Sequence, residues 1–224
     1  MTIPKIIHHI WMGKNTIPEI NLFCANSIKK TNPNFEYILW RDDDIHNMIT
    51  KYFPEYYDSF NKLPRMIMKI DMFRYFLMYK YGGLYTDMDY FMFKSFDLLN
   101  EKVIIPCNKE DENGNPICLG NCIFASEPNH PFWKSLMDTL YTIDRSKIDY
   151  LIDKNIDGNV LGTGPMFVFA MWKRYSKLND DISISKRNLF HPITNIDPEY
   201  INTLKNNNCY GMHYCTGLWR NNKL

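Results

Sequence analysis

The segment from Lys69 to Asp89 constrains the fold of this chain more than any other part of the sequence. It reads KIDMFRYFLMYKYGGLYTDMD: an amphipathic, largely apolar stretch, then Gly82-Gly83, then a short apolar run. The first stretch predicts a helix, the two glycines predict its end, and the apolar run predicts a short strand. A helix that leads through a tight turn into an apolar strand is typical of α/β proteins.

Two aspartates, Asp87 and Asp89, stand where this strand should end. Alternate residues of a strand point the same way, and a strand end that bends into a loop lets both carboxylates converge on one point. Converging anionic oxygens suit a divalent cation such as Mn²⁺ or Mg²⁺, which is usually bound together with the phosphates of a substrate. The pair therefore favours an enzyme that acts on a nucleotide or another diphosphate. The alternative is a turn with two solvated acids, because D-x-D triplets also arise by chance.

Three further features of the sequence are candidates for the same chemistry. Asp71 and Arg74 share one face of the predicted helix, either as a surface ion pair or as a part-buried pair that can hydrogen-bond sugar hydroxyls. Trp11 ends the first predicted strand, where it can pack in the core or stack on a nucleotide base. His213 ends the last predicted strand, either as a structural residue or as a third metal ligand, a nitrogen that Mn²⁺ accepts more readily than Mg²⁺.

Strands and helices alternate through the first half of the chain, which predicts a mostly parallel α/β sheet with ligands at the carboxyl ends of its strands. The predicted strands are Lys5–Ile10, Tyr37–Trp40, Leu84–Asp87, Val103–Pro106, Ile123–Ala125, Ile182–Ser185 and Cys209–Tyr214, and the predicted helices are Pro18–Lys30, Asp42–Tyr52, Arg65–Tyr81, His130–Tyr141 and Met166–Tyr175. A polar loop is expected at Asn108–Asn115, and acceptor contacts are expected from Asn108–Asn121. No linker divides the chain, so residues 1–224 are expected to form a single domain.

The composition argues against some classes of function. The 224 residues carry 26 basic and 25 acidic side chains, which argues against a nucleic-acid-binding protein that neutralises phosphates. The N-terminus does not read as a signal peptide, and no window approaches ~18 consecutive apolar residues, so we expect no membrane span and a cytoplasmic location. The six cysteines are therefore expected to be free thiols. A zinc site from Cys107, Cys118 and Cys122 is the weaker alternative, because C-x₂-C pairs are missing.

The motifs together resemble glycosyltransferase family 32, the D-x-D sugar-binding glycosyltransferases, which include the yeast initiating mannosyltransferase and, more distantly, the clostridial glucosylating toxins. The opening Pro4–Trp11, the Gly162–Pro165 turn and the closing His213-x-x-x-Gly217-x-Trp219 are similar to family segments. The resemblance spans about Pro4 to Trp219. The hallmark D-x-x-R-…-L-…-Y-G-G-x-Y-x-D-x-D is matched at Asp71, Arg74, Leu77, Tyr81, Gly82, Gly83, Tyr85, Asp87 and Asp89.

The resemblance implies a GT-A fold, a Rossmann-like sheet on which the D-x-D motif holds Mn²⁺, or Mg²⁺, against the diphosphate of a nucleotide-sugar donor. It implies retaining transfer of a hexose or N-acetylhexosamine, from a UDP-sugar in preference to a GDP-sugar, to a glycan, protein or lipid-linked acceptor. The site residues that it implies are Asp87, Asp89 and His213 for the metal, Asp87, Asp89 and Asn121 for catalysis, and Trp11, Asp71, Arg74, Tyr85, Gly164 and Trp219 for the substrate.

Two positions depart from the family pattern, because Leu218 replaces the usual Ser and Tyr214 replaces the second His of a common pair. Two other functions stay open. A phosphohydrolase of the haloacid dehalogenase type also carries D-x-D after a strand, but it has Thr or Val where this chain has Phe91. The other is a module that binds sugar nucleotide without turnover.

Overall fold

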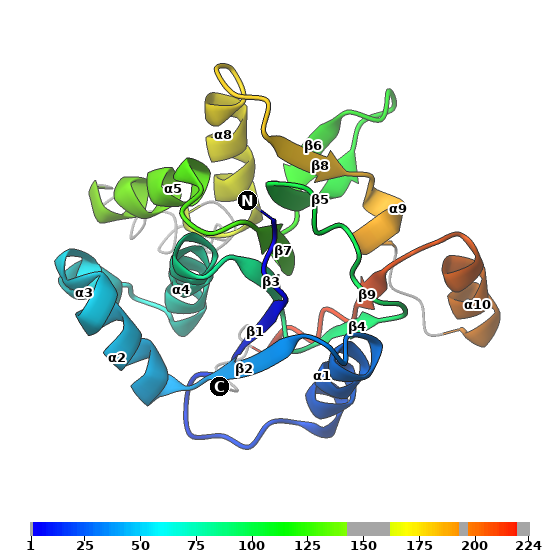
Figure 1. The fold of residues 1–224 in the computed structure, drawn as a ribbon, viewed down its shortest axis with the longest axis horizontal. Helices are drawn as coiled ribbons and strands as arrows, with labels where there is room; N and C mark the ends of the chain where they lie inside the picture. The colour runs from blue at the N-terminus through cyan, green and yellow to red at the C-terminus, as the bar shows by residue number, and fades with distance from the viewer. Residues whose placement is uncertain (1, 143–161, 193–196, 219–224) are drawn as a thin grey trace.

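The computed structural model describes residues 2–142, 162–192 and 197–218. They form an α/β fold with a seven-stranded sheet and a separate two-stranded sheet (Figure 1). The described strands are β1 (Ile6–Ile10), β2 (Glu36–Trp40), β3 (Gly83–Thr86), β4 (Tyr90–Met92), β5 (Val103–Glu110), β6 (Pro116–Leu119), β7 (Ile123–Ser126), β8 (Ile182–Ser185) and β9 (Gly211–His213). The described helices are α1 (Glu19–Thr31), α2 (Asp42–Tyr52), η1 (Pro54–Tyr56), α3 (Tyr57–Asn61), α4 (Met66–Lys80), α5 (Pro131–Thr142), α8 (Pro165–Tyr175), α9 (Arg187–Phe190) and α10 (Pro198–Asn206).

The large sheet has the strand order β2-β1-β3-β7-β5-β6, and β8 pairs with β5. β1 is parallel to both β2 and β3, and β8 is parallel to β5. β7 is antiparallel to both β3 and β5, so β3 and β5 run in the same direction. Within the described sheet, β7 and β6 alone oppose the other strands. The mostly parallel α/β sheet predicted from the sequence is confirmed.

The elements predicted up to Asp87 are all present, and their ends differ from the prediction by one residue at most. The polar loop predicted at Asn108–Asn115 is wrong. β5 continues to Glu110 and returns through β6 as a hairpin. Asp111 stabilises its turn, because one carboxylate oxygen accepts hydrogen bonds from the backbone N–H groups of Asn113 (2.9 Å) and Asn115 (2.8 Å). The strand ends are exposed to solvent there, which is why they carry the polar residues of a loop.

Two hydrophobic clusters cover the two faces of the large sheet. Along β5, Val103 and Ile105 belong to one cluster and Ile104 to the other, as the alternation of strand side chains requires. The first cluster packs against α2, α4, α5 and α8, and the second packs against α1 and α9 (Figure 1). None of the described helices combines the length and the apolar character that crossing a membrane requires.

α4 is the central helix of the first cluster. Every residue from Ile70 to Met78 is buried, as is typical of a helix that lies inside a protein. The amphipathic character predicted for this helix is therefore wrong, because α5 and the sheet leave it no solvent-exposed face along this stretch. As a consequence, two charged side chains of α4, Asp71 and Arg74, lie in the interior.

Gly82 and Gly83 let α4 turn directly into β3. Their φ angles are +62° and +85°, a region that glycine enters without steric cost. A Cβ atom on Gly82 would lie 2.5 Å from the backbone oxygen of Ser126, and one on Gly83 would lie 2.6 Å from that of Ile6. This close approach fixes the start of β3 between β1 and β7, and so it fixes where β3 delivers Asp87.

We expect Gly82→Ala to lower the free energy of unfolding by about 3 kcal/mol or more, since it adds left-handed strain to a clash with fixed backbone. Gly114→Ala is the matched control. Gly114 also has a positive φ (+80°), but nothing lies within 4 Å of its Cβ position, so about 1 kcal/mol of backbone strain is expected. Urea denaturation followed by circular dichroism measures both losses, and equal losses would contradict the prediction.

His8 and His9 lie fully buried in β1. His8 hydrogen-bonds through Nε2 to the backbone oxygen of Gly82 (3.0 Å), and its Nδ1 accepts a hydrogen bond from Trp40 (3.1 Å). His9 Nε2 is 2.6 Å from the hydroxyl oxygen of Thr86. Burial lowers the pKa of His8 to about 4 and the pKa of His9 to about 3. Both histidines are therefore neutral parts of the sheet at physiological pH.

The free energy of unfolding should decrease as the pH is lowered below about 6.5. In the unfolded chain His9 takes up a proton near pH 6.5, whereas in the folded protein it does so only near pH 3. We expect His9→Gln to abolish the uptake of about one proton that accompanies unfolding of the wild type below pH 6.5. Below pH 6.5, the unfolding free energy of the wild type should then fall more steeply than that of the variant, by up to about 1.4 kcal/mol per pH unit. Urea titrations at several pH values compare the two slopes, and parallel slopes would refute the assignment.

Candidate active site

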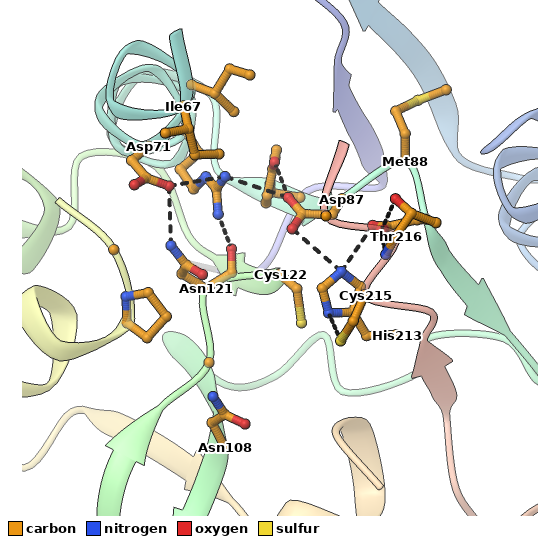
Figure 2. A pocket seen from close by; sticks show the side chains of 18 of the residues that line it. Ile67, Asp71, Asp87, Met88, Asn108, Asn121, Cys122, His213, Cys215 and Thr216 are labelled. Atoms are coloured by element: carbon orange, nitrogen blue, oxygen red, sulfur yellow. Dashed lines mark hydrogen bonds and ion pairs between the residues drawn. The ribbon is translucent and has the colours of Figure 1, made fainter. Parts of the chain in front are cut away.

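Segments far apart in the sequence meet where β1 and β3 end. β7 runs antiparallel to β3, so its start lies beside the end of β3, and the Asp87 N–H donates a hydrogen bond to the Cys122 carbonyl (2.7 Å). In the small sheet, Tyr90 pairs with His213, which brings the C-terminal strand to the same place. A cavity of about 600 Å³ lies here (Figure 2), within the usual range of small-molecule sites.

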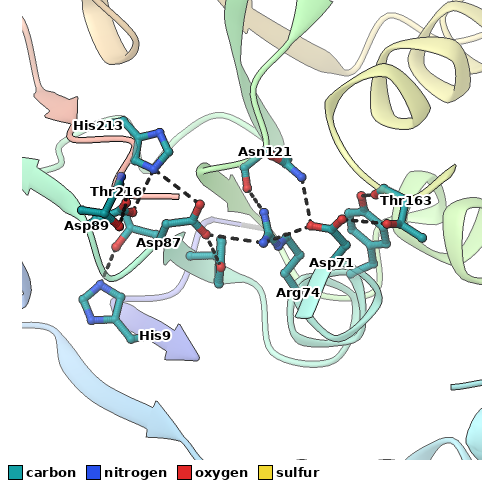
Figure 3. Close-up of polar contacts among 12 residues, drawn as sticks. His9, Asp71, Arg74, Asp87, Asp89, Asn121, Thr163, His213 and Thr216 are labelled. Atoms are coloured by element: carbon teal, nitrogen blue, oxygen red, sulfur yellow. Dashed lines mark hydrogen bonds and ion pairs between the residues drawn. The ribbon is translucent and has the colours of Figure 1, made fainter. Parts of the chain in front are cut away.

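Asp87, Asp89 and His213 converge at one wall of this cavity (Figure 3). One ligand atom from each lies within 4.8 Å of the others. The Nε2 atom of His213 is 2.8 Å from Asp89 Oδ1 and 3.7 Å from Asp87 Oδ2. Two carboxylates and one imidazole fit a divalent cation such as Mn²⁺, which accepts both oxygen and nitrogen ligands.

Asp89 is held in place from two sides. Its Oδ2 atom accepts hydrogen bonds from the backbone N–H (2.8 Å) and the hydroxyl (2.7 Å) of Thr216, while Oδ1 faces His213. Burial alone would raise the pKa of Asp89, but the contacts with His213 and Thr216 outweigh it and hold that pKa well below its usual range. Burial opposes the charge on His213, yet Cys122 and Asp89 raise its pKa well above the usual value.

Asp71 and Arg74 form a fully buried ion pair, with 3.1 Å between Asp71 Oδ1 and Arg74 Nη2. The surface ion pair left open by the sequence is thereby excluded. Asp71 also accepts hydrogen bonds from the Asn121 amide (3.1 Å) and the Thr163 hydroxyl (2.7 Å). Arg74 donates to the Asn121 backbone oxygen and lies 3.5 Å from Asp87 Oδ1. The guanidinium therefore joins the helix aspartate to the aspartate at the strand end (Figure 3).

Tyr85 completes this network. Its ring lies under the Arg74 guanidinium, 4.9 Å from the guanidinium carbon, and its hydroxyl donates to Asp87 Oδ1 (2.5 Å). Burial opposes the charge on Arg74, but Tyr85, Asp87 and Asp71 keep its pKa above the usual value. Burial also raises the pKa of Tyr85 well above its usual value, so its hydroxyl stays a donor. Tyr85 thus orients Asp87 from within the cavity wall.

Of the other predicted substrate residues, Trp11 and Gly164 lie at the cavity, and Leu218 lines it too. In the sequence, Trp11 precedes α4 and Gly164 follows it. Tyr214 packs instead against the small cluster around Met212. Trp219 lies outside the described residues.

Sequence reasoning did not assign Thr163, His191 or Thr216 to the site, and it considered Cys122 only as a ligand of the cysteine zinc set. Cys122 and His191 line the cavity together with His213. Thr163 and Thr216 each donate a hydroxyl to a site aspartate. Thr163 lies within the Gly162–Pro165 turn and Thr216 directly precedes Gly217, so both stand in segments that are similar to the family, and this placement was the available signal. His191 follows the short helix α9, which the sequence did not predict.

Cys122 is a buried thiol of the cavity wall, as is Cys118, and all six cysteines are free, as expected. Burial alone would raise the pKa of Cys122, but His213 and His191 outweigh it and lower the pKa to about 7. The zinc set of Cys107, Cys118 and Cys122 is wrong for the described residues. Cys122 groups with two histidines instead.

Comparisons with known proteins show what this chain is similar to. Residues 18–106 match the family model described as "Glycosyltransferase sugar-binding region containing DXD motif". Inositol phosphoceramide mannosyltransferase 3 of Schizosaccharomyces pombe is 30% identical over 179 residues, which is 80% of this chain and 47% of that protein. An uncharacterized glycosyltransferase of Acanthamoeba polyphaga mimivirus is 29% identical over 197 residues, 85% of this chain and 73% of that protein. The chain spans about half the length of the Schizosaccharomyces pombe mannosyltransferases that it matches.

Solved structures share the fold at low sequence identity. The ligand-free glycosyltransferase domain from the YGT toxin superposes with a TM-score of 0.62 at 8% identity, covering 82% of this chain and 80% of that domain. The PaToxG glycosyltransferase superposes with a TM-score of 0.53 at 19% identity, covering 79% and 70%. The GT-A fold expected from the sequence is thereby confirmed.

Proposed function

Because this chain belongs to the family of glycosyltransferases whose sugar-binding region contains a DXD motif, we propose that it transfers a hexose or N-acetylhexosamine from a nucleotide-diphospho-sugar to a hydroxyl acceptor, with retention of configuration and a divalent cation. The convergence of Asp87, Asp89 and His213 within 4.8 Å at the cavity wall carries this proposal. Mn²⁺ is the preferred cation and Mg²⁺ the second choice, because an imidazole completes the donor set.

Each acidic residue has its own task in this proposal. Asp89 and His213 would ligate the cation, and Asp87 would bridge the cation and the ribose. A cation held there supplies Lewis-acid stabilisation of the charge that develops on the departing diphosphate. Arg74 lies 3.5 Å from Asp87 and orients that carboxylate.

The Asp71–Arg74 pair would hold the hydroxyls of the donor sugar. A carboxylate oxygen has more than one acceptor site, so Asp71 can accept a sugar hydroxyl besides its protein donors. The Asn121 side chain is oriented by its bond to Asp71, and its amide would lie near the anomeric carbon. Trp11 would stack on the base, and Gly164 would allow close approach to the donor.

A front-face reaction fits the charges around the cavity. In the described parts of the chain, the carboxylates that line the cavity are Asp71, Asp87 and Asp89, and each is paired with Arg74 or His213. Ion pairing makes a carboxylate a poor nucleophile. The acceptor oxygen would therefore bond to the anomeric carbon as the bond to the diphosphate breaks, and the hydroxyl proton would pass to the diphosphate.

The acceptor would enter beside the β5–β6 hairpin. Asn108, Lys109 and Ile117 of this hairpin line the cavity, and Ile117 is 47% exposed. The names of the Schizosaccharomyces pombe relatives state mannosyl transfer to inositol phosphoceramide. We therefore propose a glycan or lipid-linked hydroxyl as acceptor. A nucleotide-activated mannose should be tested as donor together with the UDP-sugars.

A thermal-shift screen of UDP- and GDP-sugars, with and without Mn²⁺, tests the proposal. A donor at 100 times its dissociation constant stabilises the folded state by about 2.7 kcal/mol, a rise of about 5–10 °C in melting temperature for a chain of this size. The stabilising donor is then assayed for release of nucleoside diphosphate with water or an acceptor. Binding without release would favour a non-catalytic module, and release of phosphate from sugar phosphates would favour a phosphohydrolase.

A further inference from the structure

A second group of metal-binding side chains lies beside the first. Cys122, His191 and His213 bring one thiol sulfur and two imidazole nitrogens within 4.8 Å of one another. Three separate elements supply them, since Cys122 precedes β7, His191 follows α9 and His213 ends β9. Figure 2 shows Cys122 and His213 on the same wall of the cavity. All three residues line the cavity, which gives a cation a path of entry.

We propose that Cys122, His191 and His213 form an inhibitory site for a thiophilic divalent cation such as Zn²⁺. One sulfur and two nitrogens with a fourth position open to the cavity match the ligands and number that zinc takes. At zinc bond lengths of about 2.0–2.3 Å, tetrahedral donors lie about 3.3–3.7 Å apart, so small side-chain rotations complete the site. Mg²⁺ and Mn²⁺ prefer oxygen, so the thiolate selects against them.

The surroundings favour a preformed site. Cys122 is 2% exposed, and its backbone oxygen accepts the Asp87 N–H. His191 lies next to Gly120, where a Cβ atom would approach its ring to 3.3 Å, so the glycine leaves the imidazole its place. The His191 and His213 rings meet edge to face with centroids 5.8 Å apart.

His213 makes the two sites mutually exclusive. A neutral imidazole has a single acceptor nitrogen, so it serves one cation at a time. When Zn²⁺ takes His213, Asp87 and Asp89 lose their third ligand and hold Mn²⁺ less tightly. The coupling is reciprocal, so excess Mn²⁺ must weaken Zn²⁺ binding by the same factor.

Cobalt titration tests the site without any need for turnover. Co²⁺ takes the place of Zn²⁺ in such sites and gives a thiolate-to-metal charge-transfer absorption only when sulfur is a ligand. We expect this band in the wild type at one equivalent of Co²⁺, loss of the band in Cys122→Ser, and displacement of Co²⁺ by Zn²⁺. No band in the wild type would overturn the proposal.

A second thiol supplies the matched control. The Cys215 sulfur is exposed and lies 3.2 Å from His213 Nδ1, so it is the competing thiolate donor. Cys215→Ser should keep the band, and a band lost in Cys215→Ser but kept in Cys122→Ser would refute the site. Asp89→Asn should also keep the band, which separates this site from the proposed catalytic one.

Inhibition is the second measurement, and it rests on the proposed transferase activity. Micromolar Zn²⁺ should inhibit the Mn²⁺-supported reaction of the wild type, whereas the turnover that Cys122→Ser retains should not respond to the same Zn²⁺ concentration. Inhibition that persists in Cys122→Ser would overturn the regulatory role. A chain that shows the cobalt band but no transfer with any donor would leave the metal site standing and refute the proposed function.

Discussion

Asp89→Asn is expected to abolish sugar transfer, lowering turnover by about 1,000-fold or more, and to remove the gain in donor affinity that Mn²⁺ provides. Asp89 is only 8% exposed and divides its oxygens between His213 and Thr216. The amide is neutral and a far weaker ligand. Losing about 4 kcal/mol of Lewis-acid stabilisation corresponds to a 1,000-fold slower reaction. Release of nucleoside diphosphate, measured with and without Mn²⁺, gives the effect.

The substitution keeps the shape of the side chain, so the fold should survive. The asparagine oxygen can still accept from Thr216, and circular dichroism should match the wild type. Asp43→Asn is the control, since Asp43 is an exposed aspartate on α2, away from the cavity. Asp43→Asn should turn over donor at the wild-type rate. Wild-type turnover in Asp89→Asn would show that the proposed metal site is wrong.

The first half of the fold could be predicted because its signals are local. Several signals act within a few residues: the apolar runs, the glycine pair Gly82-Gly83, the Asn32-Pro33 pair after the first helix and the acidic residues at the start of α2. The elements β1, α2 and β3 follow them. Two strands that the sequence did not predict, β4 and β6, depend on pairing with another strand. β6 exists because β5 extends beyond the sheet core to Glu110, and β4 exists because β9 pairs with it. Such pairing leaves no periodicity in the sequence.

The site was predictable where a motif places side chains on one element. Asp87 and Asp89 converge, and the Asp71–Arg74 pair is buried beside them, because helix and strand geometry fix their spacing. Contacts between elements were not predictable. That Arg74 reaches Asp87, that Tyr85 donates to Asp87 and that Thr216 binds Asp89 depends on how α4, β3 and the C-terminal segment pack.

Asp71→Ala is expected to destabilise the fold by about 3–5 kcal/mol, the usual cost of removing one partner from a buried ion pair. Arg74 would keep its charge with Asp87 as the remaining acidic partner, and Asn121 and Thr163 would each lose an acceptor. Urea denaturation measures the loss. Asp71→Asn, which keeps an acceptor oxygen, should lose less and provides the variant for binding measurements if the alanine variant does not fold.

Asp71→Ala should also remove the selectivity for the donor sugar, while the affinity for the nucleotide is largely kept. If Asp71 holds sugar hydroxyls, the sugar nucleotide loses its advantage over the bare nucleoside diphosphate, because the base and diphosphate contact other residues. Competition between the two ligands for binding to Asp71→Ala measures this ratio. Asp181→Ala is the control, since Asp181 pairs with His130 (3.2 Å) outside the cavity, so its loss should lower stability and leave the ratio unchanged. An unchanged ratio in Asp71→Ala would show that Asp71 has only a structural role, as the partner of Arg74.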